Sequence, residues 1–159
     1  MSLFSKNTTR LAFLLAFSVP IQAMAAEPIA TAAPTATSVD NTKGLLVILT
    51  DAEPMTQMMA LILATQTLEQ GKSLQILLCD KAGQLAVKNS KETIFAPINK
   101  SPQMLLAGLI ARGVQVEVCP LFLPNFNMSE SQLITGVSVA KPPVIAKNMR
   151  TEGIRLLTF

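Results

Sequence analysis

Two runs of branched apolar residues constrain the fold of this 159-residue chain more than any other feature. They are GLLVILT at 44–50 and SLQILLC at 73–79. Continuous apolar runs of this length are typical of strands that are buried on both faces of a parallel sheet. Residues 55–70, between the two runs, have the length and the apolar pattern of a helix, and Gly71 marks its end. The sequence therefore predicts a strand–helix–strand unit whose helix crosses one face of the sheet.

The rest of the chain repeats this alternation. Ser101 has the place of a helix N-cap, Pro102 that of the first helical residue, and Gly113 ends the helix. The other predicted elements are a turn with a short helix at 80–90, a loop at 91–100, strands at 114–119 and 154–159, a short helix from Ser129, a turn or short strand at 136–140, and a helix at 141–153. Strands that alternate with helices predict an α/β fold, with a small doubly wound, mainly parallel sheet and helices on both faces.

The N-terminus has the pattern of a secretory signal peptide. Lys6 and Arg10 precede a short apolar stretch at 11–19, and Ala23 and Ala25 occupy the small-residue positions that a signal peptidase reads. We expect residues 1–25 to be removed after Ala25 and the protein to be periplasmic in a bacterium; an uncleaved anchor is the alternative. No later stretch approaches the roughly 18 apolar residues of a membrane span, so none is expected after cleavage.

Composition divides the remaining chain in two and limits its chemistry. Residues 26–43 are small, contain Pro and Thr and lack periodicity, which predicts a flexible linker. Residues 44–159 have the size of one domain.

The mature chain would carry almost no net charge. Removal of Lys6 and Arg10 with the signal peptide leaves 11 of the 13 basic residues against 10 acidic ones, a net charge of +1. With no Trp, Tyr or basic stripe, nucleic-acid binding is not expected. The chain has no histidine, which excludes Ser-His-Asp and Cys-His catalysis, and no phosphate-binding glycine loop, so no cofactor is expected.

The two cysteines each end a predicted strand. In doubly wound sheets, ligands bind outside the carboxyl ends of the strands, where Cys79 and Cys119 would lie. Cys119 is either a small core residue or a working thiol, whose thiolate the backbone N–H groups after it would stabilise, although Pro120 removes one. A Cys79–Cys119 disulfide is a further possibility in an exported protein. If the first strand lay between the second and third, the cysteines would be about 9–10 Å apart, beyond the roughly 7 Å limit between bridged Cα atoms, but another strand order would allow the bond.

Methionines and aspartates are predicted at the same edge. Met55, Met58 and Met59 begin the first helix; their spacing is that of a core-facing stripe, and the alternative is a copper(I) site formed with the two thiols. Asp51 fits a helix cap better than a catalytic acid, and Asp80 fits a turn.

The order of three segments resembles that of the DsrE/DsrF-like (YchN-like) proteins. The segments are GLLVILTDAEP, ALILATQTLEQGKSLQILLCDKAGQLAVK, and LLAGLIARGVQVEVCPLFL, which is followed by a GV. The resemblance covers 44–159 and implies a small α/β sandwich that assembles into trimers or hexamers. In the sulfur-relay members of the family, the strand-end cysteine carries sulfane sulfur as a persulfide. That role maps onto Cys119 alone, and the family assigns none to Cys79.

The resemblance and the predicted signal peptide together imply a periplasmic sulfur-carrier or thiol-relay protein that exchanges sulfur with protein partners and is more a carrier than a stand-alone enzyme. The signal peptide is a departure from the relay members, which work in the reducing cytoplasm. It places Cys119 where oxidation competes with persulfide chemistry. The alternatives are a ligand- or copper(I)-binding periplasmic module and a non-catalytic structural oligomer.

Overall fold

The computed structural model describes residues 39–159, which form a five-stranded, all-parallel sheet with the order β4-β3-β2-β1-β5. The predicted signal peptide and residues 26–38 of the predicted linker lie outside the described residues. Among the helices from residue 39 onward, none has the length and apolar character to cross a membrane.

The strands and helices alternate as the sequence predicts. The strands are β1 (Gly44–Leu49), β2 (Ser73–Leu78), β3 (Gln115–Val118), β4 (Val137–Val139) and β5 (Ile154–Thr158). The helices are α1 (Pro54–Glu69), the 3₁₀ helix η1 (Asp80–Ala86), α2 (Pro102–Ala111), α3 (Phe122–Asn125), the 3₁₀ helix η2 (Glu130–Gln132) and α4 (Pro142–Asn148). The four-residue helix α3 is the element that the sequence did not predict.

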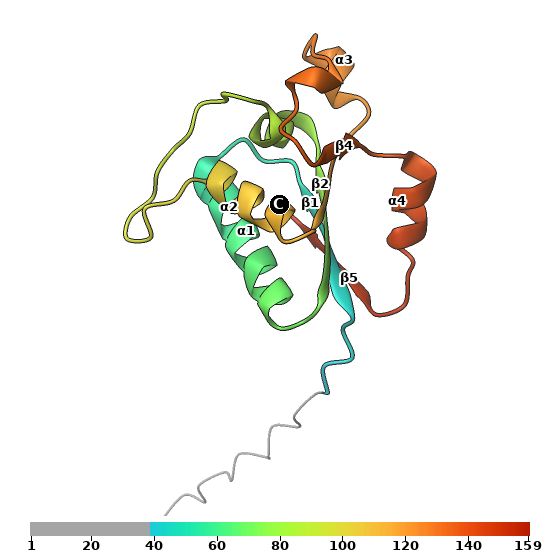
Figure 1. Cartoon of the computed structure of the whole chain (residues 1–159). Helices are drawn as coiled ribbons and strands as arrows, with labels where there is room; N and C mark the ends of the chain where they lie inside the picture. The colour runs from blue at the N-terminus through green and yellow to red at the C-terminus, as the bar shows by residue number, and fades with distance from the viewer. Residues whose placement is uncertain (1–38) are drawn as a thin grey trace, which may run out of the picture. The chain divides into compact units, whose positions relative to one another are not determined.

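The strand order corrects one expectation. The first strand does not lie between the second and third: β2 pairs with β1 on one side and with β3 on the other. Because β1, β2, β3 and β4 are laid down in one direction across the sheet, right-handed crossovers place α1 and α2 on the same face. The chain then returns across the sheet to β5, which reverses the direction and places α4 on the opposite face (Figure 1).

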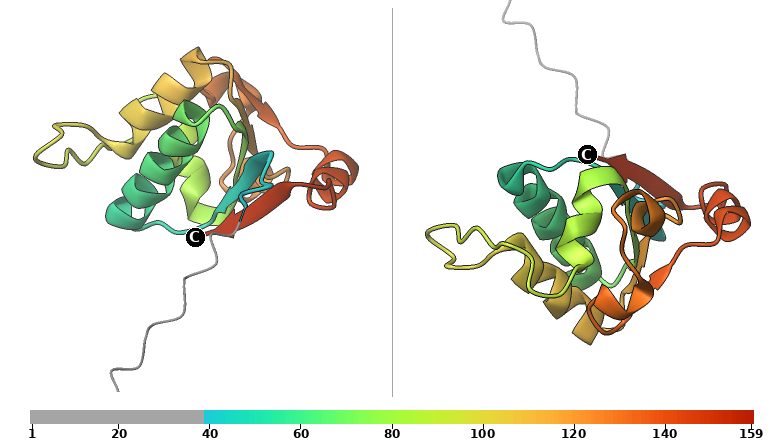
Figure 2. Two further views of the ribbon diagram at one scale, coloured as in Figure 1. Left: turned by 90° about the horizontal axis from the view of Figure 1, so that it is seen from below. Right: turned by 90° about the horizontal axis from the view of Figure 1, so that it is seen from above.

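Helices therefore cover both faces, which confirms the predicted fold class, but the cover is unequal (Figure 2). On the face of α1 and α2, alternate strand residues such as Val47, Ile76 and Val116 belong to the large core cluster. On the other face, a small cluster joins Leu46 and Leu77 to Ile145 of α4. The second face thus has the thinner layer, and it is the face that carries the candidate site.

The N-caps of the two long helices agree only in part with prediction. Ser101 caps α2, and its hydroxyl accepts a hydrogen bond from the Met104 N–H at 3.1 Å. The N-cap of α1 is Glu53, not Asp51. Asp51 instead accepts a hydrogen bond from the Glu53 N–H at 2.9 Å, so it shapes the turn that leads into the helix.

Candidate functional site

The two cysteines lie side by side at the carboxyl edge of the sheet. Leu78 of β2 pairs with Val118 of β3, and Cys79 and Cys119 follow these residues directly. The ladder continues past the strand ends, because the Cys79 N–H donates to the Leu49 oxygen and the Cys119 N–H to the Leu78 oxygen, both at 2.8 Å. Adjacent strands lie about 4.8 Å apart, so the expectation of a separation of about 9–10 Å is wrong. That separation would hold only if the first strand lay between the second and the third.

Both thiols point to the face that α4 covers. Side chains alternate between the faces of a strand, and the neighbours Leu78 and Val118 belong to the large core on the opposite face. Cys79 packs against the small cluster of Leu46, Leu77 and Ile145. Both cysteines are half-buried free thiols. The structure thus brings together two sulfur atoms that the sequence places 40 residues apart.

The neighbourhood of Cys79 keeps its thiol protonated. The pKa of Cys79 is raised from its ordinary 9.0 to about 12, first by burial, then by repulsion from and hydrogen bonding with Cys119, and last by the charge of Asp80. The Cys119 side chain is therefore near enough to disfavour ionisation of the Cys79 thiol.

Cys119 also opens onto an apolar pocket of about 440 Å³. Leu77, Pro120, Leu121, Ala140, Pro142, Ile145, Ala146 and Met149 line the rest of it. Cys79 is not among the lining residues, so Cys119 is the thiol that a molecule in this pocket would meet first. Leu121 is 67% exposed and Met149 is 40% exposed at its rim.

A series of hydrogen-bonded polar side chains, called the polar chain below, lies on the same face. Glu117, two residues before Cys119 on β3, is only 5% exposed and accepts a hydrogen bond from the Gln75 amide at 2.7 Å. The Gln75 oxygen in turn accepts one from the Asn148 amide of α4 at 2.9 Å. This chain fastens α4 to the sheet beside the thiols. The alternation in VQVEVC placed Glu117 and Cys119 on one face, and that signal could have identified Glu117.

The backbone after Cys119 offers less to a thiolate than the sequence suggested. Pro120 has no N–H, and the Phe122 N–H donates to the Cys119 carbonyl oxygen at 2.9 Å. The helix that begins there, α3, has only four residues. Burial, the neighbouring thiol and the pocket therefore define the environment of Cys119 more than a helix terminus does.

The two aspartates take structural places. Asp51 is exposed, and its carbonyl oxygen accepts a hydrogen bond from the Gln57 side chain at 2.7 Å. Asp80 has a φ of 47°, a left-handed conformation that Asp tolerates, and it turns the chain from β2 into η1. Its charge reaches Cys79, as the raised thiol pKa shows.

The methionines of α1 do not join the thiols. Met58 is buried, but Met55 and Met59 are 64% and 52% exposed, so the predicted core-facing stripe is correct for Met58 alone. Helix α1 packs on the face opposite the cysteines, so the sheet separates Met55 and Met58 from both sulfur atoms. Met149, which the sequence does not mark as a site residue, shares the pocket with Cys119. Within residues 39–159 there is no cluster of three or more His, Cys, Asp or Glu side chains that could hold a metal ion.

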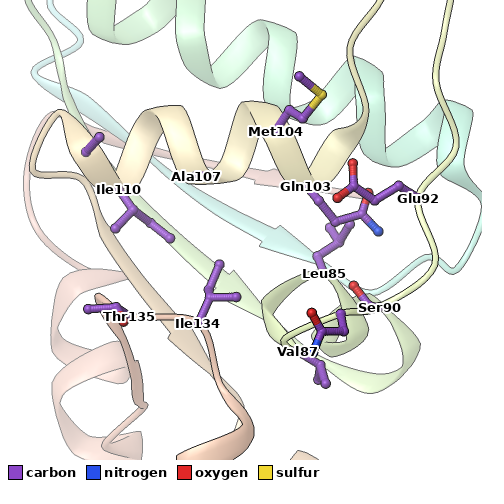
Figure 3. A pocket seen from close by; sticks show the side chains of 12 residues that line it. Leu85, Val87, Ser90, Glu92, Gln103, Met104, Ala107, Ile110, Ile134 and Thr135 are labelled. Atoms are coloured by element: carbon purple, nitrogen blue, oxygen red, sulfur yellow. The ribbon is translucent and has the colours of Figure 1, made fainter.

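A separate pocket of about 490 Å³ lies beside α2 and η1 (Figure 3). Leu85, Ile110 and Ile134 contribute apolar walls, and Glu92 and Gln103 lie at one end. The buried Oε1 of Gln103 has no hydrogen-bond partner. No cysteine lines this pocket, so it is distinct from the thiol pair.

Comparison with known proteins identifies the fold. No family model matches the chain, and no curated protein matches its sequence. Among solved structures, YchN from E. coli superimposes with a TM-score of 0.63 at 21% identity, over 74% of this chain and 100% of YchN. MTH1491 from Methanobacterium thermoautotrophicum, a protein of unknown function, superimposes with a TM-score of 0.55 at 16% identity, over 73% of this chain and 99% of its own. The protein therefore has the DsrE/DsrF-like (YchN-like) fold that the sequence resemblance implied.

Proposed function

We propose that this protein is an exported sulfur carrier that holds sulfane sulfur as a persulfide on Cys119. The observation that carries the proposal is the place of this thiol: it directly follows β3, opens onto an apolar pocket and has a second thiol beside it. The carboxyl edge of a parallel sheet is where α/β proteins bind their ligands. The resemblance assigns the persulfide to the same strand-end position.

The transfer is a thiol exchange in which one sulfur atom moves. The Cys119 thiolate attacks the outer sulfur of a persulfide donor, the S–S bond of the donor breaks, and the donor leaves as a thiolate. One S–S bond forms for each that breaks, so no oxidant or reductant is consumed. Delivery to an acceptor thiol is the same reaction in reverse. Neither step requires histidine, which this chain lacks.

The pocket suits a carrier. Its walls at Leu77, Ala140 and Ile145 are apolar, and they shield one side of Cys119 from water and from soluble thiols. The exposed rim at Leu121 and Met149 leaves the other side open to a partner. We propose that donor and acceptor are proteins, that the carrier works in the periplasm, and that it assembles into trimers or hexamers, which sedimentation of the mature protein would measure.

A copper(I)-binding module is the second candidate, because Met149 places a thioether in the pocket of Cys119. Thiolates and thioethers are soft ligands that select copper(I). The sulfur atoms available on this face are those of Cys79, Cys119 and Met149, in place of Met55 and Met58.

Intact-mass measurement separates the two candidates. Reduced protein that is exposed to inorganic polysulfide, desalted and measured at once should show a gain of about 32 Da, one sulfur atom, which a reductant removes. Cys119→Ser should gain nothing. Stoichiometric copper that survives a non-thiol competitor, together with no sulfur adduct, would favour the copper module. A wild-type Cys119 that takes neither sulfur nor an alkylating agent would contradict the carrier role.

A further inference from the structure

We propose that Cys79 is the resolving thiol of this site: it attacks Cys119 persulfide, releases the carried sulfur as hydrosulfide and forms a Cys79–Cys119 disulfide. The inference rests on the proposed persulfide at Cys119 and adds a second catalytic residue and a product. Cys79 has no role in the sulfur exchange itself, because that exchange needs one thiol only.

The first support is the geometry of the two strand ends. Leu78 and Val118 are paired, and the Cys119 N–H donates to the Leu78 oxygen, so Cys79 and Cys119 are neighbours in the next row of the sheet. The strand spacing of about 4.8 Å falls within the range of about 4.4–6.8 Å between the Cα atoms of disulfide-bonded cysteines. The bond can therefore form without a change in strand order.

The second support is that both thiols lie on one face of the sheet and next to the same apolar residues. Cys79 packs in the cluster of Leu77 and Ile145, and these two residues also line the pocket of Cys119. Cys119 is near enough to Cys79 to raise the pKa of its thiol. The attacking and the attacked sulfur atoms thus start close together, which gives an intramolecular reaction its advantage.

The third support is the difference in access between the two thiols, together with the protonation of Cys79. Cys119 lines the open pocket and Cys79 does not, so an incoming donor meets Cys119. The raised pKa of Cys79 keeps the proton on that thiol. Cys119 is therefore the residue that takes up sulfur, and Cys79 keeps the proton that the departing sulfur needs.

The step balances without an outside oxidant. The outer sulfur of the persulfide first takes the proton of the Cys79 thiol. The Cys79 thiolate formed in this way attacks the inner sulfur, Cys119 Sγ, and the bond between Sγ and the outer sulfur breaks. The outer sulfur leaves with the electron pair of that bond and with the Cys79 proton, as hydrosulfide. Two electrons pass from the cysteine pair to the sulfane sulfur, which is reduced to sulfide. A dithiol reductant then returns both cysteines to thiols.

The test compares wild type, Cys79→Ser and Cys119→Ser after loading with inorganic polysulfide without oxygen. Each reduced protein is loaded, desalted and followed by intact mass and hydrosulfide assay with no thiol added. Wild type should lose its adduct of about 32 Da, end about 2 Da below the reduced mass and release one hydrosulfide per chain. Cys79→Ser should hold its adduct about tenfold longer or more, because the intramolecular attacker is gone.

Three outcomes separate the two proposals. An adduct that decays equally in wild type and Cys79→Ser overturns the resolving role and leaves the carrier intact. Failure of every protein that retains Cys119 to load overturns both. A release rate that rises with protein concentration, with disulfide-linked dimers as product, also overturns the resolving role. Cys79→Ala serves as a second variant if Cys79→Ser does not fold, and circular dichroism reports folding.

Discussion

At the scale of single residues, the coupling of Cys79 to Cys119 is the property most open to measurement. Burial and the Cys119 side chain raise the pKa of Cys79 to about 12. Cys79 should therefore react slowly with iodoacetamide at pH 8, and faster as the pH rises toward 12, because only the thiolate attacks. Cys119→Ser removes two of the causes and should lower the pKa, so alkylation of Cys79 in that variant should become faster at a given pH. Unchanged alkylation would show that the thiols do not interact.

The same pKa sets a direction for stability in alkali. In the unfolded chain the Cys79 thiol ionises near its ordinary 9.0, whereas in the folded domain it stays protonated to about 12. The folded state therefore binds the extra proton, and this contribution to stability is lost as the pH rises from 9.0 toward 12. Replacement of Cys79 by Ser should make the urea midpoint less sensitive to pH in that window. A slope equal to that of wild type would contradict the assignment.

The sequence correctly places Cys79 and Cys119 at strand ends, because the apolar runs stop at these two residues. The distance between the cysteines could not be predicted from the sequence. It depends on which strands pair, a long-range property that no local pattern near either residue encodes. Met149 was missed for the same reason, because α4 brings it to the site from a segment whose own pattern looks ordinary. Glu117 was missed although the alternation in VQVEVC placed it on one face with Cys119.

At the scale of elements, the packing of η1 against α3 holds the chain after Cys119. Gly83 of η1 is buried, and a Cβ at this position would collide with the ring of Phe122 in α3. Gly83→Ala should therefore destabilise the domain by about 1–3 kcal/mol, measured by urea unfolding. It should also change the rate at which Cys119 is alkylated, because Phe122 is hydrogen-bonded to Cys119 through its N–H.

Gly108 provides the matched control for that substitution. It lies inside α2, and a Cβ there would have no atom within 4 Å. Gly108→Ala should raise the stability of the domain by up to about 1 kcal/mol, because Ala is the better helix former. Equal effects of the two substitutions would mean that the contact between Gly83 and Phe122 does not hold η1 against α3.

The polar chain under α4 gives a second prediction at this scale. Gln75→Ala removes the amide that bonds to buried Glu117 and leaves the carboxyl without a partner. We expect a loss of about 1–3 kcal/mol, the cost of an unsatisfied buried group, in urea unfolding. Gln115→Ala is the control, since Gln115 pairs with Gln75 across the strands but is exposed. A loss no larger than that of the control would show that the chain does not stabilise α4.

Local signals explain why most elements were predictable. Ser101 with Pro102, and Gly113 after α2, bound that helix as capping chemistry requires. Helix α3 was not predicted, because FLPN is too short for a helical period and contains a proline. It forms because Phe122 and Leu123 are buried in the core after β3 ends. Tertiary packing, not propensity, decides that segment.

At the scale of the whole molecule, the proposal depends on export. The N-terminal pattern predicts that the mature chain begins at Ala26. Mass measurement of the protein from a periplasmic extract should find that N-terminus, with the leader removed. A protein that stays in the cytoplasmic fraction would place Cys119 in a reducing compartment and would contradict the exported carrier. An exported protein that keeps residues 1–25 would contradict the predicted cleavage and indicate an uncleaved anchor.

The most direct test of the account is to find the sulfur on the protein as cells make it. Cells that express wild type, Cys79→Ser or Cys119→Ser are lysed in an alkylating agent that traps persulfides, and peptides with Cys119 are analysed by mass. We predict a trapped persulfide at Cys119 that is more abundant in Cys79→Ser than in wild type and that reductant removes. Peptides in which Cys119 carries only the alkylating group, in both proteins and without reductant, would contradict the central claim.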